Sequence, residues 1–147
     1  METKALIMKR YLTFFAVAAL AAGAGCSPKQ QAATSNESDL YKTWRLVEVQ
    51  GEAVDTSNMR RPAEFTFDKT EQRISGSAGC NNIFGKFTVA ADKLTFSPLA
   101  ATKMACPDMS VEDKFLKIVD KVNGWKVTEG FLVLSQDGNA LAKFVAK

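Results

Sequence analysis

Short stretches in which apolar and polar residues alternate dominate the chain from Tyr41 onward. The alternation is clearest in EFTFD and KLTFS, where Phe and Leu fall on one face and Thr and charged residues on the other. Turn residues separate the stretches, among them Asp137-Gly138, a strong hairpin signal. The pattern predicts strands at residues 43–49, 63–67, 85–89, 93–97, 125–128, 131–135 and 140–146.

One segment follows a helical period instead. Its apolar residues recur three and four positions apart, at Val111, Phe115, Ile118, Val119 and Val122. Asp108 or Ser110 suits the N-terminal cap, and Asn123-Gly124 suits a left-handed stop. We predict one helix near residues 109–122 whose apolar stripe packs on the sheet, with a partner-binding helix as the alternative.

The connections between the predicted strands are short. Parallel neighbours need a crossover of about a dozen residues or more, so these strands must pair antiparallel. We therefore expect a mainly β (α+β) fold, in which seven or eight short strands form a curled antiparallel sheet and one helix closes an end.

The N-terminal 25 residues have the three parts of a secretory signal: a basic start, an apolar stretch and small residues at the end. The apolar stretch at residues 11–22 is shorter than the roughly 20 residues that a membrane-spanning helix needs. Translation starts at Met1 or, for a more compact signal, at Met8. We predict a signal peptide over residues 1–25.

Cys26 follows directly and is succeeded by a polar stretch that cannot bury enough surface to fold. This arrangement resembles a bacterial lipoprotein precursor. The resemblance implies that the signal is cleaved before Cys26, that the Cys26 thiol carries a diacylglyceryl group, and that a further acyl chain such as palmitate is often added. It also implies an outer-membrane location. Gly23 occupies the position where lipoproteins usually have Leu, and Ala22-Gly23-Ala24 is also a site for ordinary signal peptidase, which would give a soluble periplasmic protein. The predicted organisation is a signal at 1–25, a flexible linker at 26–39 and one domain at 40–147.

The amino-acid composition excludes several classes of function. The 147 residues are 46% apolar and 24% charged, as in one globular domain with a tail. The sequence contains no histidine, which excludes Ser-His-Asp and Cys-His catalysis and His-ligated zinc. Beyond residue 25 the charges nearly balance and form no basic patch, which argues against a nucleic-acid partner. We predict no cofactor and no metal.

Two phrases in the middle of the chain stand out, SGSAGCNNIFGKF and SPLAATKMAC. Glycine at this density indicates a backbone that bends or approaches another closely. With other positions along the chain, the phrases resemble the META domain family of HslJ-like bacterial outer-membrane lipoproteins. The resemblance covers residues 41–144 and rests chiefly on Trp44, Gly76, Gly79, Cys80, Asn81, Gly85, Thr102, Met104 and Cys106.

The resemblance implies a lipocalin-like β-barrel or strongly curled sheet with one helix, a structural role for the motif residues, and a general link to stress and antibiotic tolerance. It implies no reaction and no ligand.

Cys80 and Cys106 are two thiols in a chain destined for an oxidising compartment, where a disulfide forms if they lie within reach. Cys26 would be consumed by lipid. Two buried free cysteines are one alternative. A soft-metal site, in which Met104 and Met109 join the two thiolates to select Cu(I), is another.

We expect a non-enzymatic, monomeric envelope lipoprotein that binds an unknown envelope protein or small ligand, because its acidic residues lie in turns, on the helix face or beside lysines. One alternative is a carrier of a small apolar ligand in the barrel interior, although ten Phe and two Trp suggest that side chains fill it. The other is an envelope protease inhibitor acting through the loop at residues 51–61, where Arg60 and Arg61 could form an anion site or a solvated pair.

Overall fold

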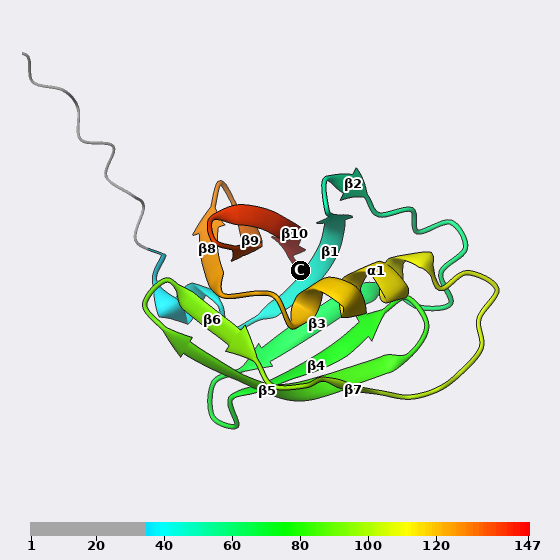
Figure 1. Ribbon diagram of the computed structural model, residues 1–147, viewed down its shortest axis with the longest axis horizontal. Coiled ribbons are helices and arrows are strands. Elements are labelled where there is room, and N and C mark those ends of the chain that lie inside the picture. Colours follow the sequence, from blue (N-terminus) through cyan, green and yellow to red (C-terminus); the bar gives the residue numbers. More distant parts are fainter. Residues whose placement is uncertain (1–34) are drawn as a thin grey trace, which may run out of the picture. The chain divides into compact units, whose positions relative to one another are not determined.

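The computed structural model describes residues 35–147 (Figure 1). The predicted signal peptide at 1–25, the lipidation site Cys26 and most of the predicted linker lie outside the described residues. Within the described part of the chain, no helix combines the length and the apolar character that crossing a membrane requires.

The described residues build one antiparallel sheet with a single α-helix. The main sheet order is β6-β5-β4-β3-β1-β10-β9-β8, while β2 pairs with β1 and β7 with β5. The elements are η1 (Glu37–Asp39), β1 (Thr43–Val49), β2 (Glu52–Ala53), β3 (Ala63–Asp68), β4 (Arg73–Ala78), β5 (Asn82–Ala90), β6 (Lys93–Phe96), β7 (Ala100–Ala101), α1 (Ser110–Val119), β8 (Gly124–Thr128), β9 (Phe131–Gln136) and β10 (Asn139–Ala146).

The sheet curls until its two end strands meet. The backbone N–H of Trp125, on β8, donates to the carbonyl of Asp92, just before β6, over 3.0 Å. The indole Nε1 of Trp125 donates to the carbonyl of Ala91 over 2.9 Å. The eight strands of the main order therefore form a nearly closed barrel, and the predicted mainly β fold of curled antiparallel strands with one helix is confirmed (Figure 1).

Tight hairpins set the register between neighbouring strands. Asp137 and Gly138 connect β9 to β10, and both have positive φ, 50° and 84°. Glu129 and Gly130 connect β8 to β9 in the same way, with φ of 52° and 82°. Two consecutive left-handed residues are the signature of a type I′ turn, whose twist matches that of the flanking strands. The hairpin predicted at Asp137-Gly138 is confirmed.

Strand β4 is absent from the strands that the sequence pattern predicted. It lies in the middle of the sheet and pairs with β3 on one side and β5 on the other. Gly76 stands at its centre, where a Cβ atom would lie 2.0 Å from the carbonyl oxygen of Glu64. Glycine here permits the close approach of two strands, and the left-handed bend follows at Gly79, with a φ of 122°.

Helix α1 is shorter than predicted at its C-terminal end. It ends at Val119, with Asp120 as its right-handed cap. The predicted left-handed stop at Asn123-Gly124 is wrong, because neither residue has positive φ. The N–H of Asn123 instead donates to the carbonyl of Ser135 over 3.0 Å, and Gly124 opens β8. These two residues therefore pair with β9 and do not form the end of the helix.

Aromatic side chains fill the space between the sheet and the helix. The Phe115 ring of α1 stacks on Phe65 with centroids 4.6 Å apart, and the Phe144 ring meets Phe65 edge-on at 6.1 Å. Such pairs contribute beyond the area they bury. The largest fully buried side chains are Trp44, Phe65, Phe67, Phe87, Phe115, Phe144, Leu40, Leu46, Ile74, Ile83, Leu94 and Ile118.

The folded part begins before the predicted domain start at residue 40. The hydroxyl of Ser35 accepts the N–H of Val127, on β8, over 2.7 Å. Leu40 is fully buried, and its carbonyl accepts the indole N–H of Trp44 over 2.9 Å. Residues 35–39 of the predicted linker are thus held against the barrel.

Candidate functional site

A network of polar side chains joins the bend after β4 to the segment before α1. The Oδ1 atom of Asn81 accepts the hydroxyl of Thr102 over 2.8 Å and the N–H of Met104 over 2.7 Å. The Nδ2 atom of Asn81 donates to the carbonyl of Met104 over 3.3 Å. Three residues of the family motif, far apart in sequence, therefore meet at one buried amide.

Glu112 of α1 completes this network, although it was not among the site residues predicted from the sequence. Its side chain is 2% exposed and accepts three hydrogen bonds: the N–H of Cys80 at 3.2 Å, the N–H of Asn81 at 2.6 Å and Nδ2 of Asn81 at 2.6 Å. Its position three residues before Phe115 places it on the buried face of the helix, and this spacing could have identified it from the sequence. Such a fully engaged carboxylate fixes the helix to the bend.

Cys80 and Cys106 form a disulfide, with an S–S distance of 1.97 Å and a Cα–Cα distance of 6.1 Å. The bond leaves neither sulfur as a thiolate, so the alternatives of free cysteines and of a copper site with Met104 and Met109 do not fit this structure. No group of three or more His, Cys, Asp or Glu residues in the described part of the chain is placed to hold a metal ion. The disulfide reinforces the connection that Glu112 and Asn81 make.

The other family-motif residues lie in the core or at close approaches of the backbone. Trp44 is fully buried. A Cβ on Gly79 would lie 3.3 Å from Cγ of Met59, and one on Gly85 would lie 2.4 Å from Cδ2 of Leu99. These positions build the domain and present no reactive group to a ligand.

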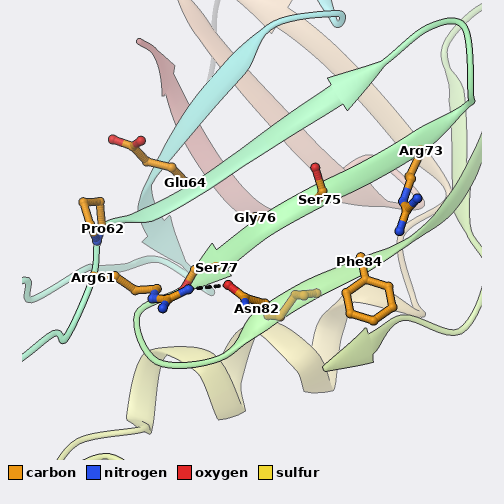
Figure 2. Close-up of a pocket in the computed structure, with 10 residues that line it drawn as sticks. Arg61, Pro62, Glu64, Arg73, Ser75, Gly76, Ser77, Asn82 and Phe84 are labelled. Carbon is orange, nitrogen blue, oxygen red and sulfur yellow. Dashed lines mark hydrogen bonds between the residues drawn. The ribbon is translucent and has the colours of Figure 1, made fainter. Parts of the chain in front are cut away.

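Beside this region, on the outer face of β3, β4 and β5, the structure has an open hollow of about 520 Å³ (Figure 2). We call it the outer-face hollow. Its lining residues are Arg61, Pro62, Glu64, Arg73, Ser75, Gly76, Ser77, Asn82, Ile83 and Phe84.

An exposed aromatic ring lies between two guanidinium groups in the outer-face hollow. Phe84 is 38% exposed, and the Arg73 guanidinium lies 5.7 Å from its ring centroid. Arg61, at the other end, donates from Nη1 to Oδ1 of Asn82 (Figure 2). Apolar and cationic groups thus share one small surface.

The rim of the hollow carries an ion-paired carboxylate, Glu64. Nζ of Lys147 lies 2.7 Å from Oε2, and Nη2 of Arg45 lies 2.9 Å from Oε1. The hydrogen bond from Lys147, together with that from Arg45, holds the pKa of Glu64 below its usual range. Glu64 is therefore an acceptor that stays ionised at neutral pH.

The predicted Arg60-Arg61 pair is divided between two hollows. A second hollow of about 370 Å³ includes both arginines and Met59, and it shares Arg61 with the outer-face hollow, whereas Arg60 lines only the second one. The start of the loop predicted at residues 51–61 is tied to the domain, since β2 pairs with β1 and the N–H of Val54 donates to the carbonyl of Val47 over 2.9 Å.

A third hollow is mainly apolar. It has a volume of about 480 Å³, lies between the segment after β6 and helix α1, and is lined by Phe96, Pro98, Leu99, Ala101, Leu116, Val119 and Asp120. We call it the apolar groove. It lies outside the barrel, whose interior the aromatic side chains occupy.

Comparison with known proteins identifies relatives of this architecture. The family model described as META domain matches residues 38–147. A protein from Burkholderia xenovorans, solved by NMR, is 20% identical, with a TM-score of 0.61 over 95% of this chain and 99% of that one. Another protein solved by NMR is 22% identical, with a TM-score of 0.57 over 73% of this chain and 90% of that one.

A crystal structure of a duf4847 family protein from Bacteroides vulgatus is 16% identical, with a TM-score of 0.50 over 73% of this chain and 92% of that one. No curated protein matches the chain. At these identities the solved structures establish a shared fold and carry no statement about activity.

Proposed function

The chain belongs to the META domain family, and from this membership we propose that it is a non-enzymatic, monomeric, lipid-anchored protein of the bacterial outer membrane. In this proposal its domain lies in the periplasm, binds an envelope component through the outer-face hollow, and thereby supports tolerance to stress or antibiotics.

One observation carries the binding role. Phe84 stands 38% exposed between Arg73 and Arg61 in a hollow of about 520 Å³. The volume of the hollow falls within the range of small-ligand sites. Aromatic residues and arginine are also enriched at protein interfaces relative to the rest of the surface.

The sequence supports the proposed anchor. Cys26 precedes the first described residue, Ser35, by nine positions. A polar segment of that length, lacking the apolar residues needed to fold, would tether the barrel close to the membrane surface. One acyl chain gives marginal residence, whereas two or three make the attachment effectively permanent.

The buried and ion-paired carboxylates support a non-enzymatic role. Both oxygens of Glu112 are engaged by donors from Cys80 and Asn81. The Glu64 oxygens are engaged by Arg45 and Lys147. General acid-base catalysis needs a carboxyl group free to exchange a proton with substrate, and these two groups already serve the structure.

The proposal is tested by complementation in the bacterium that encodes the chain. A strain lacking the protein receives the wild type, Phe84→Ser, Cys26→Ala or the matched control Phe131→Ser. Phe131 is 36% exposed and has Lys143 5.7 Å from its ring, so it copies the surroundings of Phe84 on another face. Survival under detergent, heat and antibiotic challenge is measured.

We expect the wild type and Phe131→Ser to restore survival, and Phe84→Ser and Cys26→Ala to fail although both accumulate as folded protein. Full rescue by Phe84→Ser would show that the outer-face hollow is not needed for the function. Full rescue by Cys26→Ala, with the protein recovered in the soluble periplasmic fraction, would remove the anchor.

A second candidate function, carriage of a small apolar ligand, is favoured by the apolar groove. Its lining by Leu99, Leu116 and Phe96 would suit an acyl or isoprenoid chain. Native mass spectrometry of protein gently extracted from membranes would detect such a ligand. Its loss in a Leu116→Lys variant would support carriage, whereas ligand-free wild-type protein would count against it.

A further inference from the structure

We infer that the outer-face hollow binds an anionic saccharide, a sugar chain that carries carboxylate or phosphate groups. The inference rests on the proposed function and names the ligand class of the same site. It starts from the register of the strands, which arranges the outward-facing side chains in rows across the sheet.

Successive rows carry an acidic and polar set, then an aromatic side chain, and then a cationic side chain. One row crosses the sheet from Glu64 to Ser77 and Asn82, and the next pairs Ser75 with Phe84. Arg73 lies in the last row, between Asp68 on β3 and Lys86 on β5, four residues from Ser77 along β4. At roughly 3.3 Å per residue this is about 13 Å of strand, with the Phe84 ring between the cationic ends (Figure 2).

The two cationic ends suit carboxylate or phosphate. A guanidinium presents a planar fork of N–H groups that matches these anions with two parallel hydrogen bonds. In the described part of the chain, the Arg61 fork makes one side-chain hydrogen bond, to Asn82. Arg73 has Glu71 at 3.7 Å, a pair in which both side chains are about half exposed. Both forks therefore keep N–H groups for a ligand.

The middle of the hollow suits a sugar ring. The apolar C–H face of a pyranose packs on an aromatic ring, and Phe84 offers 38% of its surface. Sugar hydroxyls need donors and acceptors beside that face, and Ser75, Asn82 and Glu64 line the same hollow. Because Glu64 is already paired with Arg45 and Lys147, it can accept hydrogen bonds from sugar hydroxyls without leaving an uncompensated charge.

The position of the hollow argues against an extended peptide. Peptides that bind sheets usually add as a strand to a free edge. Here β4 is paired along both edges, with β3 and β5, and the hollow lies on the face of the sheet. A ligand must therefore be recognised by side chains alone, which favours a compact ring over a backbone. The volume of about 520 Å³ falls in the range of small-ligand sites.

The test measures binding to the folded, disulfide-bonded domain by NMR titration. Three probes separate the sources of charge: trigalacturonate for carboxylates, glucosamine 6-phosphate for phosphate, and the neutral galactose trimer as control. An acidic hexapeptide tests the competing ligand class. The variants are Arg61→Gln, Arg73→Gln and Phe84→Ser. Arg60→Gln removes the same charge from outside the hollow and serves as the matched control.

We expect an anionic probe to shift the resonances of Ser75, Asn82 and Phe84, and the neutral trimer to shift none of them. Arg61→Gln and Arg73→Gln should each weaken binding about tenfold, since a charge-assisted hydrogen bond is worth about that factor. Phe84→Ser should also weaken binding, because the sugar ring loses the aromatic surface on which it packs, while Arg60→Gln leaves binding unchanged. Preference for trigalacturonate or for the sugar phosphate identifies which anion the site reads.

Three results would overturn the inference. Binding of the hexapeptide with the same arginine dependence, and of no saccharide, would replace the ligand class. Saccharide binding whose affinity is unchanged in the three hollow variants would show that the binding site lies elsewhere on the domain. Absence of binding by both anionic saccharides, while Phe84→Ser still fails in cells, would reject the saccharide and leave the proposed binding face intact.

Discussion

Glu112 of helix α1 accepts hydrogen bonds from both the backbone and the side-chain amide of Asn81, which lies 31 residues earlier in the chain. Because Asn81 also holds Thr102 and Met104, one carboxylate and one amide join the bend after β4, the segment before the helix, and the helix itself. The disulfide between Cys80 and Cys106 closes the same connection covalently.

Replacing Glu112 with Gln should destabilise the domain. Gln keeps one acceptor oxygen but turns an NH₂ group toward donors, so at least one buried N–H of Cys80 or Asn81 loses its partner. A buried unsatisfied donor costs about 1–3 kcal/mol, and urea unfolding should show a decrease of that size. Asp113→Asn, at an exposed position on the same turn, is the control and should lose only a few tenths of a kcal/mol. Equal losses in both variants would contradict the role of Glu112.

The disulfide should contribute about 3.5 kcal/mol, the chain-entropy value for cysteines 26 residues apart. The Cys80→Ala, Cys106→Ala double variant should therefore unfold at clearly lower urea concentration than the wild type. Alkylation followed by intact-mass measurement checks the bond directly. The native domain should take up label at these cysteines only after reduction, and labelling of both without reductant would show that the bond is absent.

The paired carboxylate of Glu64 should give a small acid-dependent contribution to stability. The hydrogen bond from Lys147, with that from Arg45, places the folded-state pKa below the ordinary 4.5. A lowered folded pKa stabilises the fold above pH 4.5, and this stability is lost as the pH falls through the lowered value. The wild type should thus exceed Glu64→Gln by about 1 kcal/mol or less at neutral pH.

The difference should shrink on acidification below pH 4.5, which urea unfolding at several pH values would record. Glu71→Gln, which removes a carboxylate 60% exposed and 3.7 Å from Arg73, provides the charge-matched control. A Glu64 difference that is constant with pH would assign the effect to packing and not to the ion pairs.

Local chemistry explains which parts of the fold were predictable. Period-two alternation identified β3 and β6, and Asp137-Gly138 identified its hairpin, because strand pleat and type I′ turns depend on neighbouring residues. These features are encoded within a few positions of the sequence. The helix begins close to its predicted start, but the predicted N-cap residues Asp108 and Ser110 were wrong: the N-cap is Met109, which has no side-chain cap bond, and Asp108 instead accepts the N–H of Ser110 over 2.8 Å.

Features that depend on distant strands were not predictable in this way. The predicted end of α1 was wrong because the N–H of Asn123 donates to the carbonyl of Ser135, on β9. The outer-face hollow combines Arg61 with Phe84 and Arg73 through the register of three strands, and the sequence pattern contained no strand at β4 from which to derive that register. The role of Glu112 was not predictable from neighbouring residues, because its partners Cys80 and Asn81 lie about 30 residues earlier in the chain.

Gly76 offers the most direct test of how β4 is held. A Cβ at this position would lie 2.0 Å from the Glu64 oxygen and 2.8 Å from Cα of Phe65, both backbone atoms that cannot rotate away. Gly76→Ala must therefore separate β3 from β4 or shift their register, which would disturb the packing of Phe65 on Phe115. We expect a loss of more than about 3 kcal/mol in urea unfolding, or no folded protein, since overpacking against fixed atoms exceeds the usual 1–3 kcal/mol range. Ser75→Ala, one residue away on the exposed face, should stay within about 0.5 kcal/mol of the wild type. If Gly76→Ala were as mild as that control, the close approach of the two strands would not be what requires glycine here.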